Sequence, residues 1–270
     1  MTPVTAPIPN PQSLIAGDFL NPKSLIPRSA RDAANGLVAA LLAPSCAVCN
    51  AILASPINGC VCMDCWAAVR PITPPLCDSC GDPLPRPDAR CLGCSDALVV
   101  TRARAIGEYE GTLREIIHAL KYSRRYSLAR PLAELMRRRG RELLEDIDCV
   151  VPVPLHWRRE YHRGFNQARE IARHLGPPVM DALVRRRATR AQVELAADRR
   201  KTNVAGAFAI RRWFATSTLQ GCRVLLIDDV STTGATLEAC AGVLRESGAS
   251  VVCALTAARV VTRPWPKGPA

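Results

Sequence analysis

The chain has 270 residues, of which 48% are hydrophobic and 22% charged, a balance typical of a globular protein long enough for more than one domain. It contains no apolar run of about eighteen residues, which argues against a membrane-spanning helix, and its first residues lack the basic start and apolar centre of a secretory signal. We therefore expect a cytoplasmic protein with no membrane association. The formal net charge of +12 arises within residues 101–213. Such a basic block favours polyanions such as nucleic acid or phosphate esters, although for any single arginine a solvated helix face is the simpler interpretation.

Two short segments open the chain. Residues 1–30 are rich in proline and are predicted to be a disordered lead-in. Residues 31–45 carry apolar residues at helical spacing, with Ser29 as a cap before them and Pro44 as a stop. This pattern predicts a short helix that docks on the rest of the protein.

Cysteine is concentrated in the next segment, where nine of the 13 cysteines lie between residues 46 and 94. Two thiolates in one C-x-x-C turn can reach the same metal ion, and two such turns complete a tetrahedral zinc site. Residues 46–95 are therefore predicted to form a double zinc ribbon with one or two structural zinc ions, which would supply most of its stability. The predicted ligands are Cys46, Cys49, Cys62, Cys65, Cys77, Cys80, Cys91 and Cys94.

Several alternatives remain for the cysteines. A disulfide framework would need an oxidising compartment, and four tandem pairs argue against a redox pair. Consecutive pairs could share a metal, or alternate pairs could, as in a cross-brace. Cys60 stands outside the C-x-x-C spacing, as a spare residue or a substitute ligand. Cys149, Cys222, Cys240 and Cys253 lie in apolar surroundings and are interpreted as core residues.

From about residue 96 onward, strand and helix patterns alternate. We expect strands within 98–111, 147–155, 206–210, 222–229 and 250–260, and helices within 112–123, 128–145, 163–176 and 232–249. This order predicts an α/β fold with a mainly parallel sheet covered by helices on both faces. Ligands bind beyond the carboxyl ends of strands in such sheets, and Asp228 and Asp229 stand at one such end while residues 151–155 form another.

The stretch VLLIDDVSTTGAT, residues 224–236, combines two acids with a hydroxyl-rich turn. Gly234 permits a tight turn into the following helix, where backbone N–H groups and threonine hydroxyls can bind a phosphate. The two acids can accept hydrogen bonds from sugar hydroxyls or contact a divalent metal, so ribose 5-phosphate would satisfy both halves. A threonine that merely caps the helix explains one hydroxyl but leaves the paired acids unexplained.

The same stretch resembles the 5-phosphoribosyl-1-pyrophosphate (PRPP) motif of type I phosphoribosyltransferases. The resemblance implies that Asp228 and Asp229 contact the ribose hydroxyls, directly or through magnesium, and that the following turn holds the 5-phosphate. The residues of this turn are Ser231, Thr232, Thr233, Gly234, Ala235 and Thr236. The sequence VVPVPL, which includes Pro154, resembles the strand and loop that hold pyrophosphate in these enzymes.

A wider resemblance covers residues 35–260. HALKYSRRYSLARPLAELM, VVPVPLHWRREYHRGFNQAREIA and RRRATRAQVELAADRRKTNVAGAF, with the cysteine pairs before them, are similar to the ComF family. The family joins a double zinc ribbon to a type I phosphoribosyltransferase-like domain, here placed at 96–265. It implies a PRPP site that uses magnesium and a role in natural transformation, where imported single-stranded DNA is processed.

Basic and polar residues near the expected crevice are candidates for pyrophosphate binding. Guanidinium groups of Arg158, Arg159 and Arg163 suit pyrophosphate oxygens, with a surface arginine cluster as the alternative. Asn166 and Gln167 are expected to line the crevice, whereas Phe165 is expected to pack. The family resemblance further suggests a mobile lid that covers the site. The positions that match the family pattern are Gln192, Arg199 and Asn203 in this lid, and Lys121 and Tyr122 before it.

The function stays open between three interpretations. Thr232 stands where purine-type relatives carry an acid, so a purine acceptor is disfavoured and catalytic residues are left unassigned. A PRPP-binding protein or pyrophosphate-releasing transferase is the first interpretation. A single-stranded DNA-binding factor is the second, and the third is a scaffold whose zinc module docks a competence helicase or recombination mediator. In both of these the PRPP site would be regulatory or non-catalytic.

Overall fold

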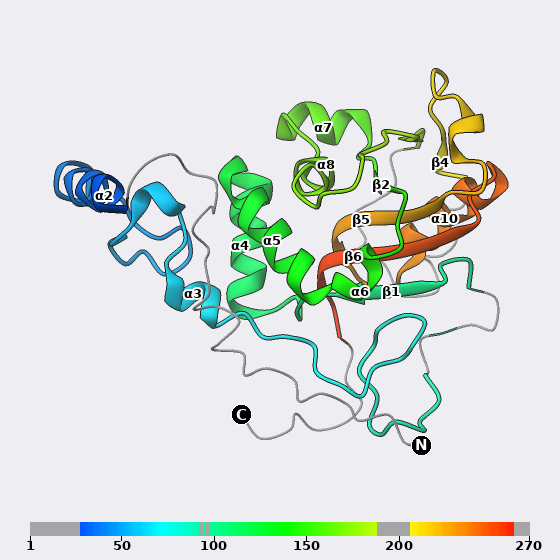
Figure 1. The fold of residues 1–270 in the computed structure, drawn as a ribbon, viewed down its shortest axis with the longest axis horizontal. Helices are drawn as coiled ribbons and strands as arrows, with labels where there is room; N and C mark the ends of the chain where they lie inside the picture. Colours follow the sequence, from blue (N-terminus) through cyan, green and yellow to red (C-terminus); the bar gives the residue numbers. More distant parts are fainter. Residues whose placement is uncertain (1–27, 92–93, 95–97, 188–205, 262–270) are drawn as a thin grey trace. The chain divides into compact units, whose positions relative to one another are not determined.

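The computed structural model describes residues 28–91, 94, 98–187 and 206–261, drawn in colour in Figure 1. The chain divides into two compact units between Val69 and Arg70, and each unit is described by itself. The lead-in expected before the first helix and the lid positions Gln192, Arg199 and Asn203 lie outside the described residues. Within the described ranges, no helix is both long enough and apolar enough to cross a bilayer.

The first unit contains one long helix and a cysteine-bearing turn structure. Helix α2 (Arg28–Leu42) ends two residues before Pro44, and it is followed by the 3₁₀ helix η1 (Pro56–Asn58) and by α3 (Met63–Ala67). The side-chain oxygen of Asn35 accepts a hydrogen bond of 3.0 Å from the Ile57 amide, which joins α2 to η1. Because Asn35 is only 4% exposed, this bond satisfies a buried amide side chain rather than a surface group.

The second unit is built around a parallel four-stranded sheet. Its order is β1-β6-β5-β2, with β1 (Arg102–Ala105) at one edge, β6 (Val251–Arg259) and β5 (Arg223–Ser231) in the centre, and β2 (Cys149–Pro152) at the other edge. A separate antiparallel pair joins β3 (Leu183–Arg185) to β4 (Phe208–Ile210). The expected α/β fold with a mainly parallel sheet is confirmed.

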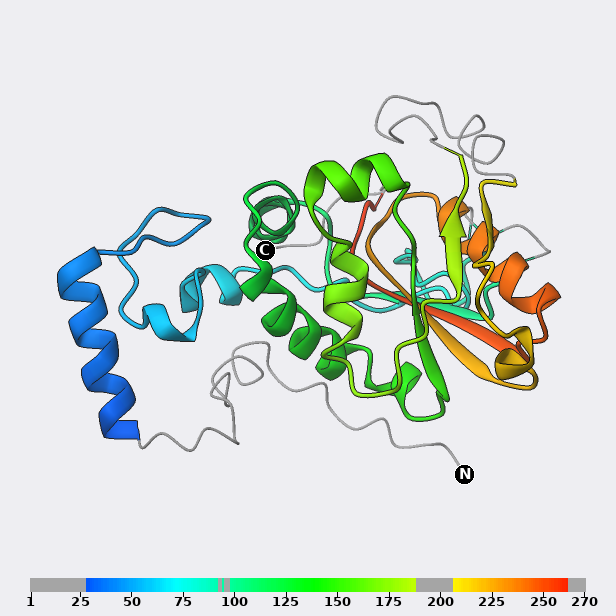
Figure 2. The same ribbon diagram turned by 90° about the horizontal axis from the view of Figure 1, so that it is seen from above.

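Helices cover both faces of this sheet, as the view from above in Figure 2 shows. Helices α5 (Ala129–Arg139) and α8 (Gln167–Ala172) pack on one face, while α10 (Ala235–Glu246) packs on the other beside β4. The other helices in the described part of this unit are α4 (Gly111–Tyr122), η2 (Tyr126–Leu128), α6 (Arg141–Leu144), α7 (Trp157–Arg163) and η4 (Thr216–Leu219). With both faces covered, the central strands are rich in apolar residues, and the side chains from Val224 to Ile227 are fully buried.

The structure differs from the sequence expectations at four places. The helix expected over 128–145 is interrupted at Gly140, where a Cβ atom would lie 2.7 Å from the Leu255 side chain. Strand β5 does not stop at the two acids, because Val230 and Ser231 continue its pairing with β6. The turn expected after β2 contains the helix α7, and of the four isolated cysteines only Cys222 is not buried.

Candidate functional site

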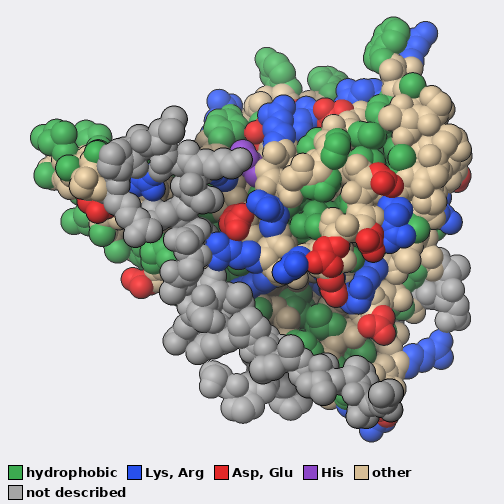
Figure 3. All heavy atoms as spheres, in the orientation of Figure 1, with side chains coloured by type: hydrophobic (Ala, Val, Ile, Leu, Met, Phe, Trp, Pro, Cys, Tyr) green, Lys and Arg blue, Asp and Glu red, His purple; other side chains and the backbone are tan. Residues whose placement is uncertain are grey.

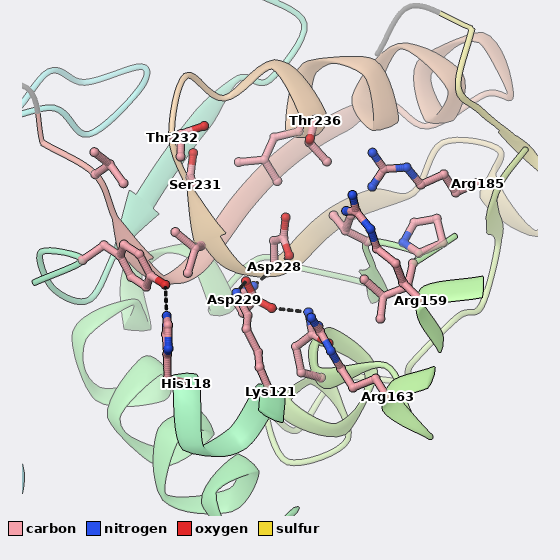
Figure 4. Close-up of a pocket in the computed structure, with 18 of the residues that line it drawn as sticks. His118, Lys121, Arg159, Arg163, Arg185, Asp228, Asp229, Ser231, Thr232 and Thr236 are labelled. Atoms are coloured by element: carbon pink, nitrogen blue, oxygen red, sulfur yellow. Dashed lines mark hydrogen bonds and ion pairs between the residues drawn. The ribbon is translucent and has the colours of Figure 1, made fainter. Parts of the chain in front are cut away.

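A pocket of about 580 Å³ opens at the carboxyl ends of β2 and β5, where the sequence predicted a crevice (Figure 4). This volume lies within the usual range of small-molecule sites. Its centre is formed by Asp228 and Asp229, and three kinds of wall surround them: a hydroxyl-rich turn, a basic side and an aromatic side. The pocket therefore presents acidic, basic and neutral polar groups to one ligand.

Asp229 is held in place by two partners from different helices. Its Oδ1 atom lies 2.6 Å from the Lys121 ammonium on α4, and its Oδ2 atom accepts a hydrogen bond from the Gln167 side chain on α8. Burial by itself lowers the pKa of Lys121, but the Asp229 carboxylate outweighs burial and leaves that pKa above its ordinary value. Asp229 is thus a paired carboxylate with a fixed orientation.

Asp228 has a different environment. Its Oδ1 atom accepts a hydrogen bond of 2.8 Å from the Asp229 amide, and its carboxyl group faces the pocket in Figure 4. Burial, together with the charge of Asp229, raises the pKa of Asp228 to about 7. A ligand hydroxyl or a divalent cation would favour the ionised form, so Asp228 is the carboxylate that gains most from a bound ligand.

The turn between β5 and α10 forms the hydroxyl-rich wall. Gly234 adopts the left-handed region with φ 77°, and α10 then begins at Ala235 with no side-chain cap on its first amides. Within the described structure, the Ser231 Oγ and Thr233 Oγ1 atoms are buried and have no hydrogen-bond partner. Free amides at a helix N-terminus bind anions, so this wall suits a phosphate. Of the predicted residues of this turn, Ser231, Thr232, Gly234 and Thr236 line the pocket, whereas Thr233 and Ala235 do not.

The basic wall is formed by arginines from α7 and β3. Arg159 and Arg185 lie on the far side of Asp228 from His118 in Figure 4, and Arg163 donates a hydrogen bond of 2.6 Å to the Gln167 side chain. Pro154 and Gln167 also line the pocket. Arg158 does not; its guanidinium lies 5.2 Å from the centroid of the Trp157 ring.

Asn166 supports the pocket without lining it. Its side-chain oxygen accepts hydrogen bonds from the Ala168 and Arg169 amides at the start of α8, and its side-chain nitrogen donates to the Val153 carbonyl. Asn166 therefore caps the helix and ties it to the segment that follows β2. Phe165 is buried and packs edge-on against Tyr126, with ring centroids 4.5 Å apart.

The aromatic wall contains residues that the sequence does not predict. Tyr109 and His118 are hydrogen-bonded at 3.1 Å, and they line the pocket together with Tyr122 and Val260. Burial raises the pKa of the Tyr109 hydroxyl. On this side of the pocket, the family resemblance points only to Lys121 and Tyr122.

Arg185 is another pocket residue that the sequence does not predict. It ends a three-residue strand, which carries too little pattern to locate its side chain. No local signal marks this arginine among the others of the basic middle segment, and only its place beside Asp228 in the fold does so.

The cysteines form two separate clusters, each made from consecutive C-x-x-C pairs. The Sγ atoms lie within 4.8 Å of one another in the first cluster (Cys46, Cys49, Cys62, Cys65) and likewise in the second (Cys77, Cys80, Cys91, Cys94). Four sulfur ligands at this spacing fit tetrahedral zinc, and the alternating cross-brace is not formed. Burial raises the pKa of the Cys62 and Cys65 thiols, whereas at Cys46 backbone N–H groups outweigh burial and lower the pKa to about 6, so the protein alone favours the thiolate at Cys46 but not at Cys62 or Cys65. Cys60 belongs to neither cluster.

Comparison with known proteins agrees with this architecture. Residues 37–96 match the double zinc ribbon domain, and residues 161–267 match the phosphoribosyl transferase domain. The chain is 34% identical to the DNA utilization protein YhgH of Salmonella typhimurium over 77% of this chain and 93% of that protein. It is 30% identical to competence protein F of Haemophilus influenzae over 75% of this chain and 91% of that protein. The chain belongs to the ComF family.

Among solved structures, the chain is similar to the allosteric regulatory enzyme of purine biosynthesis. The identity is 22%, the TM-score is 0.33, and the alignment covers 49% of this chain and 26% of that one. The ComF family assignment rests on the sequence relatives and on the matched domains, and the zinc clusters are the structural zinc sites of its ribbon.

Proposed function

We propose that the pocket binds PRPP, or ribose 5-phosphate, together with magnesium. The observation that carries this proposal is the order of groups across one cavity: a hydroxyl-lined helix N-terminus, two carboxylates and an arginine wall. PRPP carries the matching groups in the same order, which are a 5-phosphate, two sugar hydroxyls and a 1-pyrophosphate. Each wall would therefore meet the part of the ligand that its chemistry suits.

Magnesium fits the carboxylate that lacks a fixed ion pair. Asp229 is already paired with Lys121, whereas Asp228 faces the pocket and holds a raised pKa. Magnesium is usually bound through one or two carboxylates and the phosphates of a substrate. Bound there, it would neutralise charge on the pyrophosphate.

A transfer reaction would break the bond between C1 of the sugar and the pyrophosphate oxygen and form a bond from C1 to an acceptor. Arg159, Arg163 and Arg185 lie where they would stabilise the departing pyrophosphate. No catalytic acid or base is assigned, and Thr232 continues to disfavour a purine acceptor. Binding without transfer is the alternative, and pyrophosphate release from PRPP, measured with a panel of free bases, distinguishes the two.

Calorimetry with PRPP and magnesium tests the binding proposal. We expect micromolar binding by the wild type and at least a tenfold loss of affinity in the double variant Asp228→Asn, Asp229→Asn. Glu145→Gln, which changes an exposed acid at the end of α6, is the matched control and should bind as the wild type does. Equal binding by the double variant, or no binding by the wild type, would reject the proposal.

A second candidate function is binding of single-stranded DNA through α7. This helix has no buried residue, Trp157 is 64% exposed and Tyr161 81% exposed, and Arg158 stacks on the Trp157 ring. Figure 3 shows basic and apolar side chains together along the upper edge of the molecule, where Figure 1 places α7. Exposed aromatic rings beside arginines suit stacked bases and a phosphate backbone. The names of the relatives, which refer to DNA utilization and competence, support a role of this kind in natural transformation. The cytoplasm, as the compartment of this role, remains a prediction from the sequence.

Fluorescence anisotropy with labelled oligothymidine tests this second function. Trp157→Ala should weaken binding several-fold, while Trp213→Ala serves as the control because Trp213 is 86% exposed and also carries a stacked arginine, but lies beyond β4. Affinity should fall steeply with added salt if phosphates are contacted. An affinity that does not change with salt concentration, or an equal loss of affinity in both variants, would contradict the assignment to α7. Docking of a competence helicase or recombination mediator remains a prediction from the sequence.

A further inference from the structure

Arg259, the last residue of β6, joins the second cysteine cluster to the pocket wall. Its side chain does not line the pocket; the residue is 6% exposed and forms an ion pair with Asp82. The same guanidinium donates a hydrogen bond of 3.1 Å to the Cys80 carbonyl. Cys80 and Asp82 belong to the second cysteine turn, so the guanidinium is held by backbone and side-chain groups of that turn.

The main chain of Arg259 is joined to residues that line the pocket. Its carbonyl accepts a hydrogen bond of 2.8 Å from the Tyr109 amide, and its position in the ladder is opposite Ser231. The next amide, that of Val260, donates to the Ser231 carbonyl at 2.9 Å. Tyr109, Ser231 and Val260 all line the pocket. Arg259 therefore has its side chain in the cysteine turn and its backbone beside the hydroxyl-rich and aromatic walls of the pocket.

The second cysteine turn is also built onto the edge of the sheet. The Ala103 amide of β1 donates to the Ser79 carbonyl at 2.6 Å, and Arg104 donates to the carbonyls of Cys77 and Asp78. Gly81 approaches so closely that a Cβ atom would lie 2.6 Å from the Ala103 carbonyl oxygen. The turn thus occupies the edge that β1 would otherwise leave open, and it belongs to the same compact unit as the pocket.

The first cysteine cluster lies in the other compact unit. Both clusters fit zinc by their ligands, yet only the second contains the groups that Arg259 binds. A short cysteine turn keeps its shape through the metal, because its own core is too small to order it. Loss of metal from the second cluster would release Asp82 and the Cys80 carbonyl and leave a buried guanidinium without its partners.

We infer that the second zinc site is a structural part of the ribose-phosphate site, with Arg259 as the positioning residue that connects them, and that the first zinc site is not. This inference rests on the proposed function for its ligand readout. The two clusters therefore have different roles, although each consists of four cysteines in two consecutive C-x-x-C pairs. Arg259 acts through the backbone positions of Tyr109 and Ser231 and does not itself touch the ligand.

The test compares full-length Cys94→Ser with Cys49→Ser. Each should lower the zinc content by one ion per chain, as measured by elemental analysis. Only Cys94→Ser should weaken binding of PRPP with magnesium, by tenfold or more. Equal weakening by both variants, or wild-type affinity in Cys94→Ser with one zinc lost, would overturn the inference.

Arg259 is tested with both zinc ions retained. Arg259→Met should keep the full zinc content and weaken PRPP binding about as much as Cys94→Ser does. Arg259→Lys keeps the charge opposite Asp82 and should recover part of the affinity. Full affinity in Arg259→Met would reject the positioning role. If Cys94→Ser does not fold, Asp82→Asn tests the connection from the other side: it leaves every zinc ligand in place, removes the charge that holds Arg259, and should weaken PRPP binding as Arg259→Met does.

Hydrogen exchange separates failure of this inference from failure of the proposed function, because it needs no ligand. Amide protection across 106–110, which includes the Tyr109 amide bonded to Arg259, should fall in Cys94→Ser and stay unchanged in Cys49→Ser. Unchanged protection in both would overturn the inference even if PRPP binds. Lost protection in Cys94→Ser alone would support it even if the wild type binds no PRPP.

Discussion

The ammonium of Lys121 lies 2.6 Å from the Asp229 carboxylate, and this ion pair gives the neighbouring acids Asp228 and Asp229 different roles. Lys121 comes from α4 and neutralises Asp229, which Gln167 on α8 also holds. Asp228 is left with a raised pKa, and among the described residues no lysine or arginine forms an ion pair with it. Asp229 is thus fixed by the protein, whereas Asp228 is available to a ligand or a cation.

Breaking the Lys121–Asp229 pair should destabilise the fold. Both side chains are largely buried, so Lys121→Met would leave a carboxylate without its counter-charge and should lower the free energy of unfolding by about 3 kcal/mol. Arg141→Met, which breaks an exposed pair with Glu145, is the matched control and should cost less than about 1 kcal/mol. Urea unfolding measures both. Adding Asp229→Asn to Lys121→Met should recover part of the loss, and a purely additive result would contradict the pairing.

Stability should depend on pH through Asp228. Its folded-state pKa of about 7 is above the ordinary value of 3.8, so the folded protein holds a proton that the unfolded chain releases. The contribution of Asp228 is complete below about pH 4 and is lost as the pH rises through 7. The free energy of unfolding of the ligand-free protein should therefore fall over this window. Asp228→Asn should flatten that part of the curve, and an identical slope in the variant would contradict the assignment.

Ligand binding should show the opposite dependence. Ribose 5-phosphate with magnesium requires the ionised carboxylate, so affinity should rise about tenfold between pH 6 and 8 as Asp228 loses its proton. The ligand phosphate also titrates, with a pKa of about 6. Asp228→Asn is the control for this effect, because the variant keeps the pH dependence that comes from the ligand phosphate and loses the part that comes from Asp228. Calorimetry across this range measures the difference, and a wild-type profile that matches the variant's would exclude Asp228 as the titrating group.

Gly234 and Gly242 should respond oppositely to alanine. A Cβ atom would have no neighbour within 4 Å at either position, but Gly234 has φ 77° while Gly242 lies inside α10. Gly234→Ala should lower the free energy of unfolding by about 1 kcal/mol because of the left-handed backbone, and should weaken PRPP binding. Gly242→Ala should raise stability by roughly 0.5–1 kcal/mol through helix propensity. Thermal unfolding of both tests the pair, and a stabilising Gly234→Ala would show that the turn is not held in this conformation.

Cys60 should be dispensable for zinc. It lies outside both four-cysteine clusters, so Cys60→Ser should retain two zinc ions per chain while Cys62→Ser retains one. Elemental analysis of the purified proteins gives the count. Loss of an ion in Cys60→Ser would show that Cys60 replaces one of the four ligands of the first cluster.

Much of this architecture could be predicted because its signals are local. The C-x-x-C pairs place two ligands on one turn, and the apolar run before Asp228 marks a buried strand whose end faces a ligand site. Consecutive pairing of the cysteines could not be predicted, since the spacing suits either arrangement until the turns are folded. Arg185, Tyr109 and His118 carry no local pattern, and they join the pocket only because the chain brings distant segments together.

The sequence by itself determined the chemistry available to this protein: eight cysteines for zinc, two acids and a hydroxyl-rich turn at a strand end, and a basic middle segment. These features can be recognised because each depends on residues close together in the chain. Only the tertiary structure decided which acid is paired, because Lys121 and Asp229 are far apart in the chain, and which cysteine turn meets β6 through Arg259. Contacts of this kind depend on the packing of the parallel sheet, where neighbouring strands are distant in sequence.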